Sequence, residues 1–184
     1  MKKVFVFVAF AIAIGAFSEV KAQDFRGSIG LELALPLGDF GDAYSLGYGL
    51  SAGGELPFGD NLAATVTVGY VLLAVDSELS DLVKSAAMIP AQLGVKYYFS
   101  EQQSGPYAHG QIGIHSRSVT TEDFDFLGVT IEGETTSDSN LSWAIGAGFF
   151  VNENIDLGLR FNSISGKDDA DASSYIGVRA AFNF

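Results

Sequence analysis

The sequence contains no cysteine, and basic residues are scarce, with 10 lysines and arginines against 22 acidic residues among 184 positions. Without cysteine, the chain has no disulfide framework and no residue to carry the acyl anchor of a lipoprotein. After the first twenty residues, no apolar run reaches the roughly 20 residues that a membrane-spanning helix needs. The length suits a single domain, large enough for a packed core or for one small closed barrel.

The N-terminus has the three parts of a secretory signal peptide. Met1-Lys2-Lys3 is followed by the apolar run 4–17 and then by Val20-Lys21-Ala22. An uncleaved membrane anchor is the alternative, but about 14 apolar residues are too few to span a bilayer. We therefore expect a signal peptide at 1–22 and one domain at 23–184. The mature chain would carry a net charge of −14, which disfavours nucleic acid as a partner.

From residue 27 onward, apolar residues alternate with small or polar ones, which is the period of a β-strand with two different faces. Each stretch has about the 9–11 residues that a tilted strand needs to cross a bilayer. The eight stretches are 27–35, 46–56, 62–73, 88–99, 106–117, 141–151, 155–164 and 173–184. One phase is almost entirely apolar, and the other holds small, polar and charged residues.

Two closed architectures fit this alternation. A soluble lipocalin-like barrel buries the apolar phase, whereas a membrane barrel turns it toward lipid and packs the polar phase inside. The connections favour the membrane barrel, because long ones at 36–45, 74–87, 118–140 and 165–174 alternate with short ones. The long connections hold 14 of the 21 acidic residues of the mature chain, so one rim is strongly anionic. Aromatic residues near the short turns suggest an interfacial girdle: Phe58, Tyr97, Tyr98, Phe99, Phe149, Phe150, Phe182 and Phe184.

Three stretches, 89–99, 105–107 and 176–184, resemble the bacterial outer-membrane β-barrel domain family, which is similar to OmpA- and OmpX-type barrels. The resemblance implies an all-β, eight-stranded, antiparallel, up-and-down transmembrane β-barrel in the bacterial outer membrane. It also implies that the C-terminal alternation is the signal read by the barrel assembly machinery. The residues of this assembly signal are Val178, Ala180, Phe182 and Phe184.

The polar phase predicts a charge network in the lumen. Three acids and three bases share it: Glu32, Glu55, Asp156, Lys96, Arg160 and Arg179. Because unpaired charges in a narrow lumen are costly, we expect these groups to pair and to obstruct the barrel axis. A small gated porin for ions or small solutes is the alternative.

Sites for catalysis, metals or cofactors are not expected. His109 and His115 are six residues apart on one strand, roughly 20 Å, which is too far for a shared metal. Some eight-stranded outer-membrane barrels modify lipid A with a His and a Ser on one lipid-facing surface, but here His115 points inward and Ser116 outward. Asp168, Asp169 and Asp171 lack the glycine and the glutamate of a Ca²⁺-binding loop.

The longest connection, 118–140, has a partial alternation that predicts a hairpin rising above the membrane, or else a loop folded over the barrel mouth. Its apolar residues form a candidate surface-binding loop: Phe124, Phe126, Leu127, Val129 and Ile131. We therefore expect a non-enzymatic, monomeric envelope or surface-interaction protein. Its expected partners are outer-membrane lipids, lipopolysaccharide, the assembly machinery and an unidentified surface ligand. The alternatives are the gated porin, a lipid A-modifying enzyme and a soluble periplasmic lipid carrier.

Overall fold

The computed structural model describes residues 25–76, 83–100, 104–121, 124–126, 129–131, 134–166 and 171–184. Eight long strands close into one barrel in the order β1-β10-β9-β8-β5-β4-β3-β2, and every neighbouring pair is antiparallel. The strands are β1 (Arg26–Leu37), β2 (Tyr44–Pro57), β3 (Leu62–Val75), β4 (Val83–Tyr98), β5 (Pro106–Thr121), β8 (Thr135–Phe150), β9 (Ile155–Ile164) and β10 (Ser173–Asn183). The predicted all-β, eight-stranded, up-and-down barrel is confirmed.

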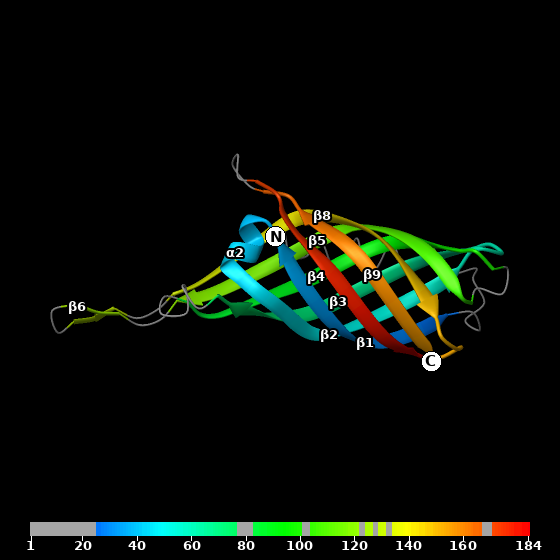
Figure 1. Cartoon of the computed structure of the whole chain (residues 1–184), viewed down its shortest axis with the longest axis horizontal. Helices are drawn as coiled ribbons and strands as arrows, with labels where there is room; N and C mark the ends of the chain where they lie inside the picture. Colours follow the sequence, from blue (N-terminus) through cyan, green and yellow to red (C-terminus); the bar gives the residue numbers. More distant parts are fainter. Residues whose placement is uncertain are drawn as a thin grey trace, which may run out of the picture.

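The barrel closes where the first and last strands pair (Figure 1). At one end of this seam, the backbone amides and carbonyls of Gly27 and Phe184 bond reciprocally, each at 2.9 Å. The start of β1 and the end of β10 therefore lie at the same end of the barrel as the connections 58–61, 99–105 and 151–154. We call this the short-turn end and the opposite one the long-loop end.

Apolar side chains cover the outside of the barrel, as the alternation predicts. Ile112 is 70% exposed and Leu141 is 72% exposed, and outward positions on all eight strands are similarly apolar. On β8 this surface runs from Leu141 to Phe149, roughly 27 Å along a strand, which suits the apolar band of a tilted membrane strand. Among the described residues, no helix is long and apolar enough to cross a membrane.

The strands extend further at the long-loop end than the alternation predicts. β5 continues to Thr121 and β8 begins at Thr135, inside the connection predicted at 118–140. Pairs of hydroxyl residues, Ser118 with Ser137 and Thr120 with Thr135, continue the pairing where the apolar pattern has ended. Beyond them, β6 (Phe124–Phe126) and β7 (Val129–Ile131) pair as a short hairpin that lies far from the barrel (Figure 1).

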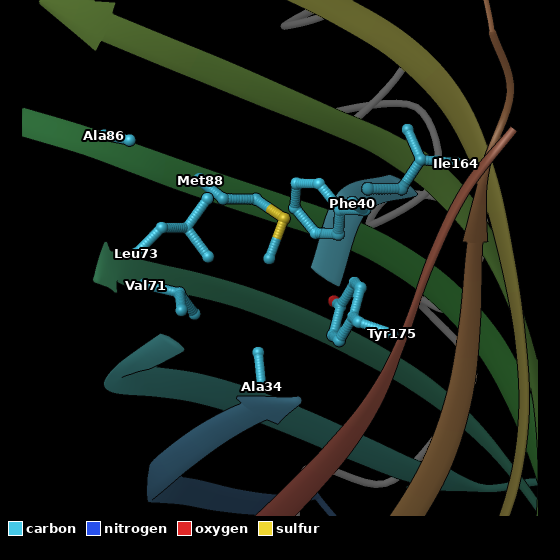
Figure 2. Packing of buried hydrophobic residues seen from close by; sticks show 8 residues of the cluster. All are labelled: Ala34, Phe40, Val71, Leu73, Ala86, Met88, Ile164 and Tyr175. Carbon is cyan, nitrogen blue, oxygen red and sulfur yellow. The ribbon is translucent and has the colours of Figure 1, made fainter. Parts of the chain in front are cut away.

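The connection predicted as the loop 36–45 contains a single helical turn, α2 (Asp39–Ala43). It starts after Gly38, whose φ of 57° is a backbone conformation that glycine adopts without steric penalty. Phe40 on this turn is buried inside the barrel mouth beside Met88 and Tyr175, as Figure 2 shows. The residues packed around it come from five strands. We call this group the loop-end cluster: Ala34, Phe40, Val71, Leu73, Ala86, Met88, Ile164 and Tyr175.

A second apolar group, the turn-end cluster, fills the opposite end of the lumen with Ala63, Tyr98, Tyr107 and Phe150. Tyr98 is fully buried and Phe150 is 4% exposed. The prediction that these two residues belong to an external aromatic girdle is therefore wrong. Tyr97 and Phe149, their neighbours in sequence, do face outward, because adjacent residues of a strand point to opposite faces.

The inward glycines provide a test of the packing between strands. A methyl group added at Gly113 would overlap the backbone carbonyl of Ala91 on β4, whereas one added at Gly110, on the outer face of the same strand, would meet nothing. We expect Gly113→Ala to lower the free energy of unfolding by about 1–3 kcal/mol and Gly110→Ala to leave it nearly unchanged. Urea titration followed by heat-modifiable gel migration measures both. Equal unfolding midpoints would contradict this account of the packing.

Candidate functional site in the lumen

Lys96 is the centre of the ion pairs near the short-turn end. Its ammonium group on β4 donates to Glu55 on β2 at 2.8 Å and lies 3.7 Å from Asp156 on β9. The ammonium also lies over aromatic rings of the turn-end cluster, 4.1 Å from the ring centre of Tyr107 and 5.0 Å from that of Phe150. Two carboxylates and the ring faces thus replace the water that the buried cation has lost.

Glu32 is the centre of a second group of ion pairs, at mid-height in the lumen. It accepts a bond from Arg160 at 2.9 Å and lies 3.3 Å from the Nε atom of Arg179. Arg179 lies 3.9 Å from Asp156 and also donates to Ser28 and Ser51. Arg179 therefore links the ion pairs around Glu32 to those around Lys96. The structure brings all six predicted lumen charges into one continuous network.

Three further residues belong to the network, and the sequence reasoning missed them. Arg26 lies 3.5 Å from Glu55. The hydroxyl of Tyr98 donates to Glu55, and that of Tyr107 donates to Asp156 at 2.7 Å. A signal for the two tyrosines was present, because each lies in the inward phase of its strand, Tyr98 two residues from Lys96 and Tyr107 two residues from His109. Arg26 lies just before the stretch 27–35 in which the alternation was recognised.

The network leaves very little free space. A cavity of about 40 Å³ lies among Lys96, Asp156, Arg160 and Arg179. Polar atoms nearby, including His109 Nε2, Gln111 Oε1 and Thr65 Oγ1, are buried without a hydrogen-bond partner in the protein. At roughly 10–15 Å³ for each water, the cavity has room for about three. Such waters would satisfy some of these atoms, but the cavity is no continuous channel.

The two histidines have structural partners. His115 is fully buried, and its Nε2 is 2.8 Å from the hydroxyl of Tyr175. His109 lies against the ring of Tyr107, with ring centres 5.7 Å apart. Within the described parts of the chain, no group of His, Asp and Glu side chains has the arrangement of a metal site.

The other predicted functional residues lie on outward surfaces or outside the described parts. Val178, Ala180, Phe182 and Phe184 are exposed at the seam with β1. Phe124, Phe126, Val129 and Ile131 belong to the β6–β7 hairpin, and Leu127 lies outside the described residues. The signal peptide at 1–22 and Asp168 and Asp169 of the acidic connection also lie outside the described residues.

Comparisons with known proteins agree on one architecture. The family model described as the outer membrane protein beta-barrel domain matches residues 5–184. No curated protein matches the sequence. The chain is similar in fold to the N-terminal β-barrel domain of Pseudomonas aeruginosa OprF, at 14% identity, with 86% of this chain and 97% of that one covered and a TM-score of 0.59.

Two further solved structures have the same fold. Ail, the attachment invasion locus protein of Yersinia pestis, is 14% identical, with 87% of this chain and 97% of that one covered and a TM-score of 0.61. Neisserial surface protein A is also 14% identical, with 87% and 96% covered and a TM-score of 0.56. At these identities the likeness establishes the fold alone.

The contribution of the network to stability can be measured at Glu32, which lies between two guanidinium groups. Glu32→Gln leaves Arg160 and Arg179 buried without their shared carboxylate, so we expect unfolding to become easier by about 3–5 kcal/mol. The double variant Glu32→Gln/Arg160→Met removes one stranded charge and should recover part of this loss. Equilibrium unfolding in lipid vesicles provides the comparison. Strictly additive losses in the double variant would show that the pair is not coupled.

Proposed function

The chain belongs to the outer membrane protein beta-barrel domain family, and on that premise we propose a non-enzymatic outer-membrane protein that presents a surface for contacts outside the cell. In this proposal the barrel anchors the protein in the membrane and does not transport solutes. The short-turn end faces the periplasm and the acidic long-loop end faces outward, as is usual for barrels with this loop pattern.

The closure of the lumen is the observation that carries this proposal. The loop-end cluster fills the outer mouth around Phe40, the turn-end cluster fills the inner mouth, and the ion pairs lie between them. An eight-stranded barrel has an interior only wide enough for its own side chains. A solute would therefore have to displace two apolar clusters and break several buried ion pairs. In this proposal, the outer surfaces of the protein are therefore the ones that bind other molecules.

The extended β5–β8 hairpin is the surface best placed for such contacts. Among the described residues, β9 pairs with β8 only as far as Ser142, so residues 135–137 of β8 have no strand neighbour on that side. An unpaired strand edge presents backbone donors and acceptors to an extended segment of another protein. The β6–β7 hairpin lies beyond this edge and brings Phe124, Phe126, Val129 and Ile131 away from the barrel.

Two rival functions fit the observations less well. A soluble lipid carrier would not cover its outside with apolar side chains such as Ile112 and Leu141. A lipid A-modifying enzyme of the His and Ser type needs both residues on one outer surface, whereas His115 is buried against Tyr175. The proposal also includes a monomeric state and contact with lipopolysaccharide. It further includes recognition by the barrel assembly machinery through the C-terminal residues Val178, Ala180, Phe182 and Phe184.

The small gated porin is the second candidate, because ion pairs, which can exchange partners, obstruct the lumen at mid-height. We expect the purified protein to show no steady conductance in planar lipid bilayers. Arg160→Ala should leave the conductance absent, because the two apolar clusters still close the ends. Discrete openings of the wild-type protein that Arg160→Ala abolishes or widens would favour the porin instead.

The hairpin can be removed without disturbing the barrel. Thr121 and Glu134 pair through the backbone, so replacing residues 122–133 by Asn-Gly creates a two-residue turn that suits antiparallel strands. We expect beads carrying this variant in nanodiscs to lose binding to cultured cells and to arrays of extracellular-matrix proteins. Replacing Phe124, Phe126, Leu127, Val129 and Ile131 by serine should have the same effect. Binding by the turn variant at the wild-type level would refute the surface role of the hairpin.

A further inference from the structure

The outer face of the barrel changes chemistry at one level on three adjacent strands. On β5 the outward residues change from Ile112 and Ile114 to Ser116, Ser118 and Thr120. On β8 they change from Leu141 to Ser139, Ser137 and Thr135, and on β4 from Ile89 to Ala87 and Ser85. The register places Ile89, Ser116 and Ser139 in a single row across the three strands. This row is where the apolar belt ends.

A groove of about 390 Å³ lies on the outer face immediately above and across this row. Hydroxyl side chains line it from three strands, and Tyr70 and Leu72 of β3 lie on its far side. We call it the hydroxyl groove, and the hydroxyls that define it are those of Ser85, Ser116, Ser118, Thr120 and Ser137.

The hydroxyls of the groove form a ladder with unused bonding capacity. Ser116 and Ser139 are 2.7 Å apart, Ser118 and Ser137 are 3.2 Å apart, and Thr120 and Thr135 are 3.0 Å apart. Each pair contains two donors but uses only one between its members. A donor and several lone pairs per rung therefore remain for a polyhydroxylated ligand.

Charge distinguishes this groove from the rest of the long-loop end. Of the described residues that line it, none is acidic, although the chain as a whole carries a net charge of −12. The acidic residue Asp138 belongs to the opposite, inward phase of β8. Among the described residues that line the groove, Arg117 alone is charged, but it belongs to the inward phase of β5, and its guanidinium donates to Ser173 on β10 at 3.1 Å. An anionic molecule in the groove would therefore meet no carboxylate among the described residues that line it.

We propose that the hydroxyl groove binds the saccharide head group of a lipopolysaccharide molecule in the outer leaflet. The hydroxyl ladder would hydrogen-bond to sugar hydroxyls, while Tyr70, at the level of the membrane interface, would pack against a sugar ring. Ile89 and Ile114, directly below, would contact the acyl chains. A free glycan lacks the chains and a glycerophospholipid lacks the sugars, whereas lipopolysaccharide has both and occupies the outer leaflet.

The inference rests on the proposed outer-membrane placement, but not on the closed lumen or on the β6–β7 hairpin. Native mass spectrometry of the detergent-solubilised full-length barrel, with purified rough-type lipopolysaccharide or phosphatidylglycerol as probe, tests it. We expect the wild-type protein to retain lipopolysaccharide under conditions that strip phosphatidylglycerol. Ser118→Val/Ser137→Val should reduce retention roughly tenfold, since two hydrogen-bonding positions are lost. Ala87→Trp, which fills the groove floor, should reduce it as well.

The matched control is Thr136→Val, which removes a hydroxyl from the opposite face of the same hairpin and should retain lipopolysaccharide like the wild type. Heat-modifiable migration establishes that each variant is folded. Equal retention of the two lipids by the wild-type protein, or equal losses in the groove variants and in Thr136→Val, would overturn the proposal. Either result would leave the conductance and hairpin experiments unaffected, so this failure is distinguishable from failure of the proposed function.

Discussion

The interior of an eight-stranded barrel is only as wide as the side chains that fill it. Because lipid covers the outside, every charged residue in the membrane-spanning part must enter this narrow space and find a partner there. Glu32 between Arg160 and Arg179, and Lys96 between Glu55 and Asp156, meet this requirement with one connected set of ion pairs. The closed state of the lumen follows from the same requirement.

The two apolar clusters complete the closure in different ways. At the short-turn end, Tyr98 and Tyr107 combine both functions, since their rings pack beside Phe150 while their hydroxyls bond to Glu55 and Asp156. At the long-loop end, a connection supplies the closing residue, because α2 brings Phe40 into the mouth beside Tyr175 and Met88 (Figure 2). Apolar side chains therefore fill both ends of the lumen.

Near the long-loop end, the outer side chains of β5 and β8 change chemistry while the pairing of the strands continues. Antiparallel pairing continues through Ser116, Ser118 and Thr120 much as it does through Ile112 and Ile114. Above the row of Ser116, hydroxyl groups replace aliphatic groups on the outer face of these two strands. One β-sheet thereby combines an apolar outer face below the row of Ser116 with a hydroxyl-bearing outer face above it.

The sequence by itself determined the number of barrel strands, their antiparallel order and the assignment of most residues to the two faces, although Tyr98 and Phe150 were wrongly placed in an external girdle. These properties depend on a period of two residues and on short turns, which are local. For the same reason, the six lumen charges could be assigned to one face, although Arg26 and the tyrosine hydroxyls were missed. Only the tertiary structure decided which charges meet. Lys96 contacts Glu55 and Asp156, which lie on strands far from it in the sequence. Which charges pair in this way depends on the register and the tilt of the strands around the closed barrel. The position of Phe40 was likewise decided by the tertiary structure, because a short connection carries no periodic pattern and its phenylalanine is buried only once eight strands have formed the mouth.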